Sequence, residues 1–150
     1  MATTIGKAYF DDGYNYIVLY AEETGTNIQN NTSSVHAWLD LVVARNVSSS
    51  GINVGVTGAN NQDLGYRSWG AGTYRLVDGY YTANHNADGS GSTNVSGYFN
   101  SYVKNLSVSG TLQLTKIPRD FTTQPKITQG TVKPNSVVIN WTTSQACDLI

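Results

Sequence analysis

The chain has 150 residues, of which only 13% are charged, and its formal net charge is −1. This length is enough for one domain with a hydrophobic core. Nucleic-acid binding normally needs a basic stripe that neutralises phosphates, and here the nine Lys and Arg residues are scattered, so the composition argues against a nucleic-acid partner.

The N-terminal sequence MATTIGKAYFDDG lacks the apolar stretch of a secretory signal, and the chain holds no apolar run long enough to cross a bilayer. There is a single cysteine, Cys147, so an internal disulfide is excluded. We therefore expect a chain that folds in a cytoplasm and has no membrane partner.

Alternation of apolar and polar residues dominates the sequence. In Ser34–Ala44 every second residue from Val35 to Val43 is apolar, which is typical of a strand with one face in a core. Turn-forming Gly, Asn and Ser clusters separate several such segments, which favours an all-β, antiparallel β-sandwich of jelly-roll-like type. Further strands are predicted at Tyr14–Ala21, Ile52–Thr57, Leu64–Trp69, Thr73–Ala83, Thr93–Tyr102 and Leu106–Ile117.

The segment YTANHNADGSGSTNVSGYF holds His85 and Asp88 within a run of Asn, Gly and Ser. An Asp-Gly pair between two aromatic-rich strands is a strong hairpin signal, because both residues suit a tight turn. We expect a β-hairpin here, with His85 beside its turn. A calcium loop is the alternative, since Asn84, Asn86 and Asp88 place oxygen atoms at every second residue, although the later Glu of an EF-hand is missing.

Aromatic residues are plentiful, with ten Tyr, three Trp and three Phe. Flat aromatic rings stack on sugar rings while Asn and Asp bind hydroxyl groups, so an exposed set would form a saccharide platform. Ordinary packing in the core or between strands is the alternative for each ring. The predicted glycan-binding residues are Tyr66, Trp69, Tyr74, Tyr81, Asn86 and Asp88, and Tyr80, Tyr98 and Tyr102 are further members of the aromatic set.

All three prolines fall late, and IPRDFTTQPK reads as an extended linker because proline removes a backbone donor. We predict a β-sandwich module at 1–118, a linker at 119–125 and a second module at 126–150. In the second module Val137, Ile139 and Trp141 alternate like the first strands of an immunoglobulin or fibronectin III sandwich. Only two or three strands are present, so we expect the chain to be the front of a longer protein.

Catalytic signatures are weak. There is no G-x-S-x-G elbow, Cys147 is distant in sequence from both His residues, and a Ser–His–Asp site with His85 and Asp88 has no local signature. No pair among the ten acidic residues stands out for glycoside hydrolysis, and neither His36 nor His85 has close companion ligands for zinc. We expect a protein that is not an enzyme and needs no cofactor.

Three motifs occur in order: IQNNTSSVHAWLDLVV, GYYTANHNADGSGSTNVSGYF and SVSGTLQLTKIPRDF. This series resembles the tailed-phage minor structural proteins, a family of siphophage tail and adsorption proteins. Those proteins carry an Asn-Thr-Ser-x-Val opening to a Trp-bearing strand, an H-N-A-D-G turn and a final strand ending in L-x-x-I-P-R. The resemblance covers residues 10–121, and the order of the motifs makes it more specific than any one of them.

The resemblance implies a virion component of the tail tip, baseplate or fibre, in which a β-sandwich precedes immunoglobulin-like modules. It implies other virion proteins as partners, a homo-oligomer, and contact with bacterial cell-wall saccharide during host adsorption. It carries over no catalytic residue. Two alternatives stay open, a carbohydrate-binding receptor-recognition module as the main role and a head-decoration or head-fibre protein. A glycan binder should present exposed aromatics with convergent polar groups, and a building block should present flat apolar patches.

Overall fold

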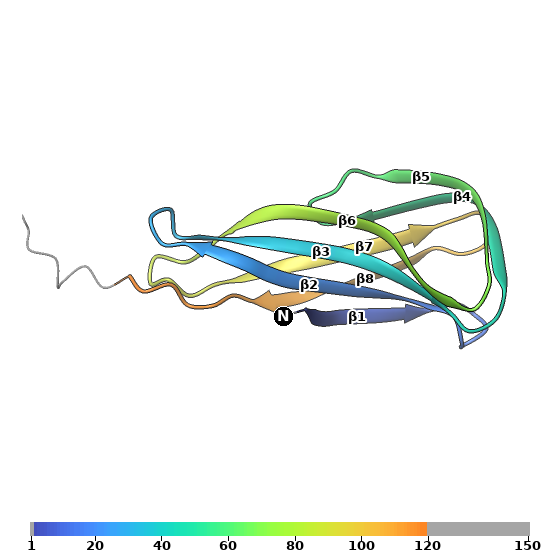
Figure 1. Cartoon of the computed structure of the whole chain (residues 1–150), viewed down its shortest axis with the longest axis horizontal. Coiled ribbons are helices and arrows are strands. Elements are labelled where there is room, and N and C mark those ends of the chain that lie inside the picture. Colours follow the sequence, from blue (N-terminus) through green and yellow to red (C-terminus); the bar gives the residue numbers. More distant parts are fainter. Residues whose placement is uncertain (1, 120–150) are drawn as a thin grey trace, which may run out of the picture. The chain divides into compact units, whose positions relative to one another are not determined.

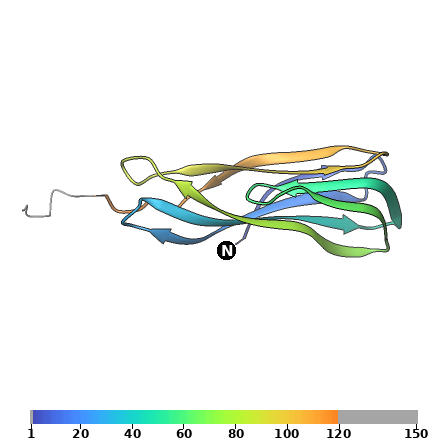
Figure 2. The ribbon, with the colours of Figure 1, turned by 90° about the horizontal axis from the view of Figure 1, so that it is seen from above.

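The structure is a computed structural model that describes residues 2–119. Eight strands in this part of the chain form two antiparallel sheets of four strands each (Figure 1). The sheets lie as two layers (Figure 2), so the predicted all-β sandwich is confirmed. Within residues 2–119 there is no helix that could span a membrane.

The first sheet has the strand order β1-β2-β3-β6 and the second has the order β5-β4-β7-β8. The strands of the first sheet are β1 (Thr3–Tyr9), β2 (Tyr16–Asn27), β3 (Thr32–Val43) and β6 (Gly72–Asn84). Those of the second are β4 (Val47–Val56), β5 (Gln62–Trp69), β7 (Ser92–Asn100) and β8 (Leu106–Gln113).

The core lies between the sheets and follows the predicted alternation. On β3 the residues from Val35 to Val43 at every second position are buried, and they share one cluster with Ile52 of β4 and Phe99 of β7. A period of two places all these side chains on one face, and burying them provides the main driving force for folding. The other face of each sheet points outward, and the residues on these two outer faces differ between the sheets.

Some strand boundaries differ from the prediction. β1 was not predicted, because TTIGKAY has little apolar alternation and its strand forms by pairing with β2 at the sheet edge. β2 continues to Asn27, past the predicted end at Ala21, because its polar second half still pairs with β3. β8 ends at Gln113. In each case backbone pairing, rather than side-chain pattern, sets the limits of the strand.

The predicted hairpin around Asp88 is wrong. β6 pairs with β3 in one sheet, whereas β7 pairs with β4 and β8 in the other, so the segment between them crosses from layer to layer. The turn itself is present, since the Gly89 amide donates to the Asn86 carbonyl at 2.9 Å and Gly89 has a φ of 90°. Local turn chemistry reverses the chain direction, but it does not determine which sheet the next strand joins.

The chain divides into a compact unit, Met1–Pro118, and a second unit from Arg119 onward. Most of the predicted linker at 119–125 and the whole immunoglobulin-like start at 126–150 lie outside the described residues. The candidate site is therefore built from the first unit alone.

Candidate functional site

The four aromatic residues of the predicted glycan site do not form one exposed platform. Trp69 is only 9% exposed and lies in the core, where its ring contacts Tyr74 and Phe99. Tyr74 and Tyr81 are half-buried and pack against the same core. Only Tyr66, at 63% exposure, is open to solvent. The expectation that Trp69 lies on an exposed face is wrong, because its position in β5 points it between the sheets.

The two polar residues of that predicted site lie in the loop between β6 and β7. Asp88 Oδ1 accepts hydrogen bonds from the Ser90 hydroxyl at 2.6 Å and the Ser90 amide at 2.9 Å, which lower the pKa of its carboxyl. The Asn86 amide donates to the Ser90 carbonyl at 2.7 Å. These contacts order the turn itself. Calcium at Asn84, Asn86 and Asp88 stays a prediction, and residues 2–119 contain no group of three or more His, Cys, Asp or Glu side chains placed to hold a metal ion.

His85 belongs to a hydrogen-bonded group that the sequence did not reveal. Its Nδ1 donates to the Gly89 carbonyl at 2.7 Å, and its Nε2 lies 2.6 Å from the Ser33 hydroxyl. Ser33 also bonds the Glu23 carboxylate. Ser33 is only 1% exposed, so its hydroxyl lies out of reach of a substrate in this arrangement. Asp88 bonds Ser90, so the hypothetical triad of His85, Asp88 and a serine is not assembled here.

Glu23 connects this group to the end of the sandwich. Its Oε1 accepts the Thr115 amide at 3.0 Å, just after β8, and its Oε2 accepts the Ser33 hydroxyl. Burial acts to raise the pKa of Glu23, but the hydrogen bonds from Ser33 and Thr115 outweigh it and the pKa is lowered. The ionised carboxylate therefore helps to fix the segment that follows β8.

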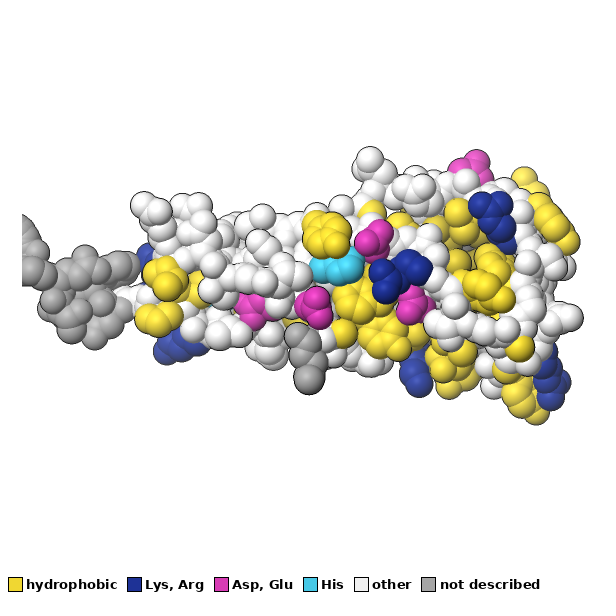
Figure 3. Space-filling model, in the orientation of Figure 1, with side chains coloured by type: hydrophobic (Ala, Val, Ile, Leu, Met, Phe, Trp, Pro, Cys, Tyr) yellow, Lys and Arg dark blue, Asp and Glu magenta, His cyan; other side chains and the backbone are white. Residues whose placement is uncertain are grey.

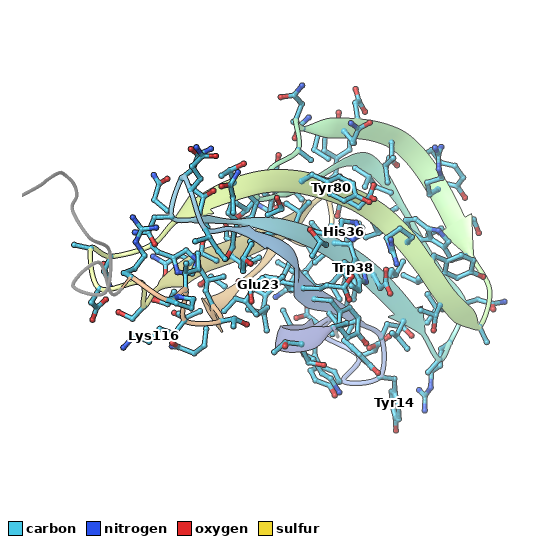
Figure 4. All side chains as sticks on the ribbon, turned by 60° about the vertical axis from the view of Figure 1, so that its left-hand side comes forward. Tyr14, Glu23, His36, Trp38, Tyr80 and Lys116 are labelled. Atoms are coloured by element: carbon cyan, nitrogen blue, oxygen red, sulfur yellow. The ribbon has the colours of Figure 1, made fainter. Side chains whose placement is uncertain are left out.

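The outer face of the first sheet carries a row of rings from three neighbouring strands. Tyr20 stacks on Trp38 with ring centroids 5.5 Å apart, Trp38 lies 4.7 Å from His36, and His36 stacks on Tyr80 at 4.2 Å. We call Tyr20, Trp38, His36 and Tyr80 the aromatic row. Figure 4 shows Trp38, His36 and Tyr80 lying one beside the next. Figure 3 shows hydrophobic side chains around the histidine on this side.

Charged groups surround the aromatic row and cover part of it. Arg75 forms an ion pair with Asp40 at 2.8 Å, and its guanidinium lies 4.8 Å from the centre of the Trp38 ring. His36 Nε2 lies 3.0 Å from Asp78. The inner rings of the row thus have their faces occupied by one another and by Arg75, whereas Tyr80, at its end, is 67% exposed.

The outer face of the second sheet has a different chemistry. Three of its four strands, β4, β7 and β8, contain no Asp, Glu, Lys or Arg, and the charged residues of the sheet, Asp63 and Arg67, lie on the edge strand β5. The Tyr98 ring crosses over Gly55, and the Tyr102 ring crosses over Gly51, each so closely that a Cβ on the glycine would overlap the ring. We call this surface, with Tyr98 and Tyr102, the tyrosine face. Sequence reasoning included both tyrosines among candidate aromatics but could not pair them with glycines about 50 residues away in the chain.

Side-chain hydrogen bonds fix the position of Tyr98. Its hydroxyl donates to Asn61 Oδ1, and Asn61 Nδ2 donates to Asn53 Oδ1 at 2.9 Å. Further along the same face a shallow hollow of about 380 Å³ lies between β7 and β8, lined by Asn94, Val95, Ser96, Ser109, Gly110 and Thr111. The tyrosine face therefore combines two flat rings with uncharged amides and hydroxyls.

Comparison with protein families matched residues 7–146 to the family described as "Siphovirus protein of unknown function (DUF859)". The chain belongs to this siphovirus family. No curated protein and no solved structure gave a significant match. The siphovirus part of the resemblance is confirmed, and membership suggests a virion-associated structural protein of a phage.

Proposed function

We propose that this siphovirus protein is a non-enzymatic structural component of the tail tip, baseplate or fibre and that it takes part in adsorption to the host-cell surface. One observation carries this proposal, namely that the two outer faces of the sandwich differ in chemistry. The first sheet presents aromatic rings and ion pairs, whereas β4, β7 and β8 present only uncharged groups.

The two faces suit two kinds of contact. Aromatic residues and arginine are enriched where proteins bind one another, so the aromatic row with Arg75 fits a contact to another virion chain. Flat rings beside amides and hydroxyls fit a saccharide surface instead. A module with both faces can bind another virion protein through the first sheet and a cell-surface saccharide through the second. The continuation into immunoglobulin-like modules, based on the alternation around Trp141, remains part of this proposal.

Immunogold labelling of intact virions with antibodies raised against the full chain tests the location. We expect gold particles at the far end of the tail. Labelling of the capsid would instead favour the head-decoration or head-fibre alternative. If purified virions carry none of this chain by labelling and by mass spectrometry, the proposal of a structural component is wrong.

A further inference from the structure

We propose that the tyrosine face binds a neutral oligosaccharide, with Tyr98 and Tyr102 as the surfaces on which sugar rings stack. This inference rests on the adsorption role proposed above and deepens it by naming the class of ligand. It also moves the saccharide site away from most of the residues that the sequence indicated.

The first argument is the orientation of the rings. Val95 and Phe99 point into the core, so Tyr98, next to Phe99 on β7, points outward. Its ring lies over Gly55, which is directly opposite it on β4. The ring is therefore held against the backbone of β4, and the side chain is half-buried. An aromatic ring that is fixed on the outer surface and partly open to solvent offers its exposed part for stacking on a sugar ring.

Tyr102 repeats this arrangement at Gly51. A Cβ at Gly51 would lie 2.6–2.8 Å from the Tyr102 ring, and Tyr102 is 87% exposed. Its amide donates to the Ser50 carbonyl at 3.1 Å, which ties the loop after β7 to β4. The two glycines are four residues apart, which is at most about 13 Å along the strand because β4 is irregular around Ile52. A chain of several sugar rings could contact both tyrosines, whereas a single ring could not.

The second argument is preorganisation. The Tyr98 hydroxyl, Asn61 and Asn53 form a continuous hydrogen-bonded chain, so the ring and both amides are already ordered without a ligand. Ordering these groups in advance reduces the entropy that binding would otherwise lose. Each amide Nδ2 carries two hydrogens and Asn61 uses one of them toward Asn53, so a donor remains for a sugar hydroxyl.

The third argument is charge. β4, β7 and β8 contain no Asp, Glu, Lys or Arg, and Asp63 of β5, the cross-strand partner of Asn53, adds a negative charge that disfavours a phosphate or a uronic acid there. Hydroxyl and amide groups line the hollow beside Asn94 and Thr111, whose side chains lie 3.3 Å apart. Groups of this kind both donate to and accept from sugar hydroxyls. The surface therefore fits a neutral saccharide better than an anionic wall polymer.

The test uses the full 150-residue chain and two-dimensional NMR. The probes are oligosaccharides of about five rings, long enough to span the ~13 Å spacing, built from glucose, galactose, rhamnose or N-acetylglucosamine. A uronic-acid oligosaccharide of the same length is the anionic comparison. We expect saturable shifts of the Asn53 and Asn61 side-chain signals with at least one neutral probe. The Kd should rise about five- to tenfold in Tyr98→Ala and in Tyr102→Ala, as expected for loss of one stacked ring.

Tyr80→Ala is the matched control, because it removes an exposed ring from the other sheet, and it should leave the Kd unchanged. Tyr98→Phe keeps the ring, so it should bind more tightly than Tyr98→Ala. The inference is overturned if no neutral probe shifts these signals at up to about 10 mM, or if Tyr80→Ala has the larger effect. Either result would leave the virion location found by immunogold labelling intact, so failure of the sugar site and failure of the structural role are distinguishable.

Discussion

The Tyr98 ring occupies the space into which a side chain at position 55 would project. Gly55 and Tyr98 are cross-strand partners on β4 and β7, and a Cβ on Gly55 would overlap the outer ring atoms. Glycine is usually unfavourable within a strand, because it adds backbone entropy to the unfolded chain and offers no side chain to pack. Here the aromatic ring of the neighbouring strand covers the glycine in place of a side chain.

Gly55→Ala should therefore displace the Tyr98 ring and destabilise the protein by about 1–3 kcal/mol, the usual cost of overpacking. Gly25→Ala is the matched control, because Gly25 also lies in a strand but has no atom within 4 Å of its Cβ position. Its free energy of unfolding should stay the same or rise slightly. Urea unfolding of both variants, followed by tryptophan fluorescence, checks the prediction. Equal stability of the two variants would contradict the described contact.

Trp69→Ala should destabilise the protein by about 3–5 kcal/mol, because a large buried side chain is removed and a cavity remains. Tyr66→Ala, three residues away on the same strand, removes an exposed ring and should change stability by less than about 0.5 kcal/mol. Thermal unfolding by circular dichroism separates the two cases. A Trp69→Ala variant as stable as the parent would show that Trp69 is on the surface, as the sequence first indicated.

Asn15→Ala should destabilise by about 2 kcal/mol or more, since buried polar groups would lose their partners. Asn15 is buried, its Oδ1 accepts the amides of Ala44 and Arg45 at 2.7 and 3.1 Å, and its Nδ2 donates to the Arg45 carbonyl at 3.0 Å. Asn27→Ala, which removes one acceptor in an exposed turn, should cost about 1 kcal/mol or less. Chemical unfolding of the two variants measures the difference, and a larger effect at Asn27 would refute the assignment.

Glu23 gives the fold a dependence on acid. Because its pKa is lowered below the ordinary value of 4.5, its ionised form stabilises the fold above that pH, and this contribution is lost as the pH falls through the lowered pKa. In Glu23→Gln the amide can donate to Ser33 while its oxygen accepts from Thr115. We therefore expect a stability within about 1 kcal/mol of the parent at neutral pH.

The parent should lose stability on acidification more steeply than Glu23→Gln, and urea unfolding at a series of pH values checks this. Asp12 and Asp88 also have lowered pKa values, from hydrogen bonds to Asn15 and Tyr14 and to Ser90 respectively, so some acid sensitivity will remain in the variant. Parallel curves for the parent and Glu23→Gln would rule out the contribution of Glu23.

The sequence predicted those features that depend on local pattern. Alternation on β3 identified which residues are buried, and the turn at Asp88 was recognised from its residue types. Local pattern does not show which distant strands pair with each other. For that reason the sequence predicted β6 and β7 as one hairpin and did not predict the edge strand β1. The contacts of Tyr98 with Gly55 and of His85 with Ser33 join residues 43 and 52 positions apart, and no local pattern marks them.

The most direct test of the adsorption role is competition on host cells. Cells of a bacterium that the phage infects are incubated with the full chain, and the rate of phage adsorption is then measured. We predict that the parent chain and Tyr80→Ala slow adsorption, whereas a chain carrying both Tyr98→Ala and Tyr102→Ala does not. If a folded parent chain at saturating concentration neither binds the cells nor slows adsorption, the protein does not contact the host and its role is confined to holding the particle together.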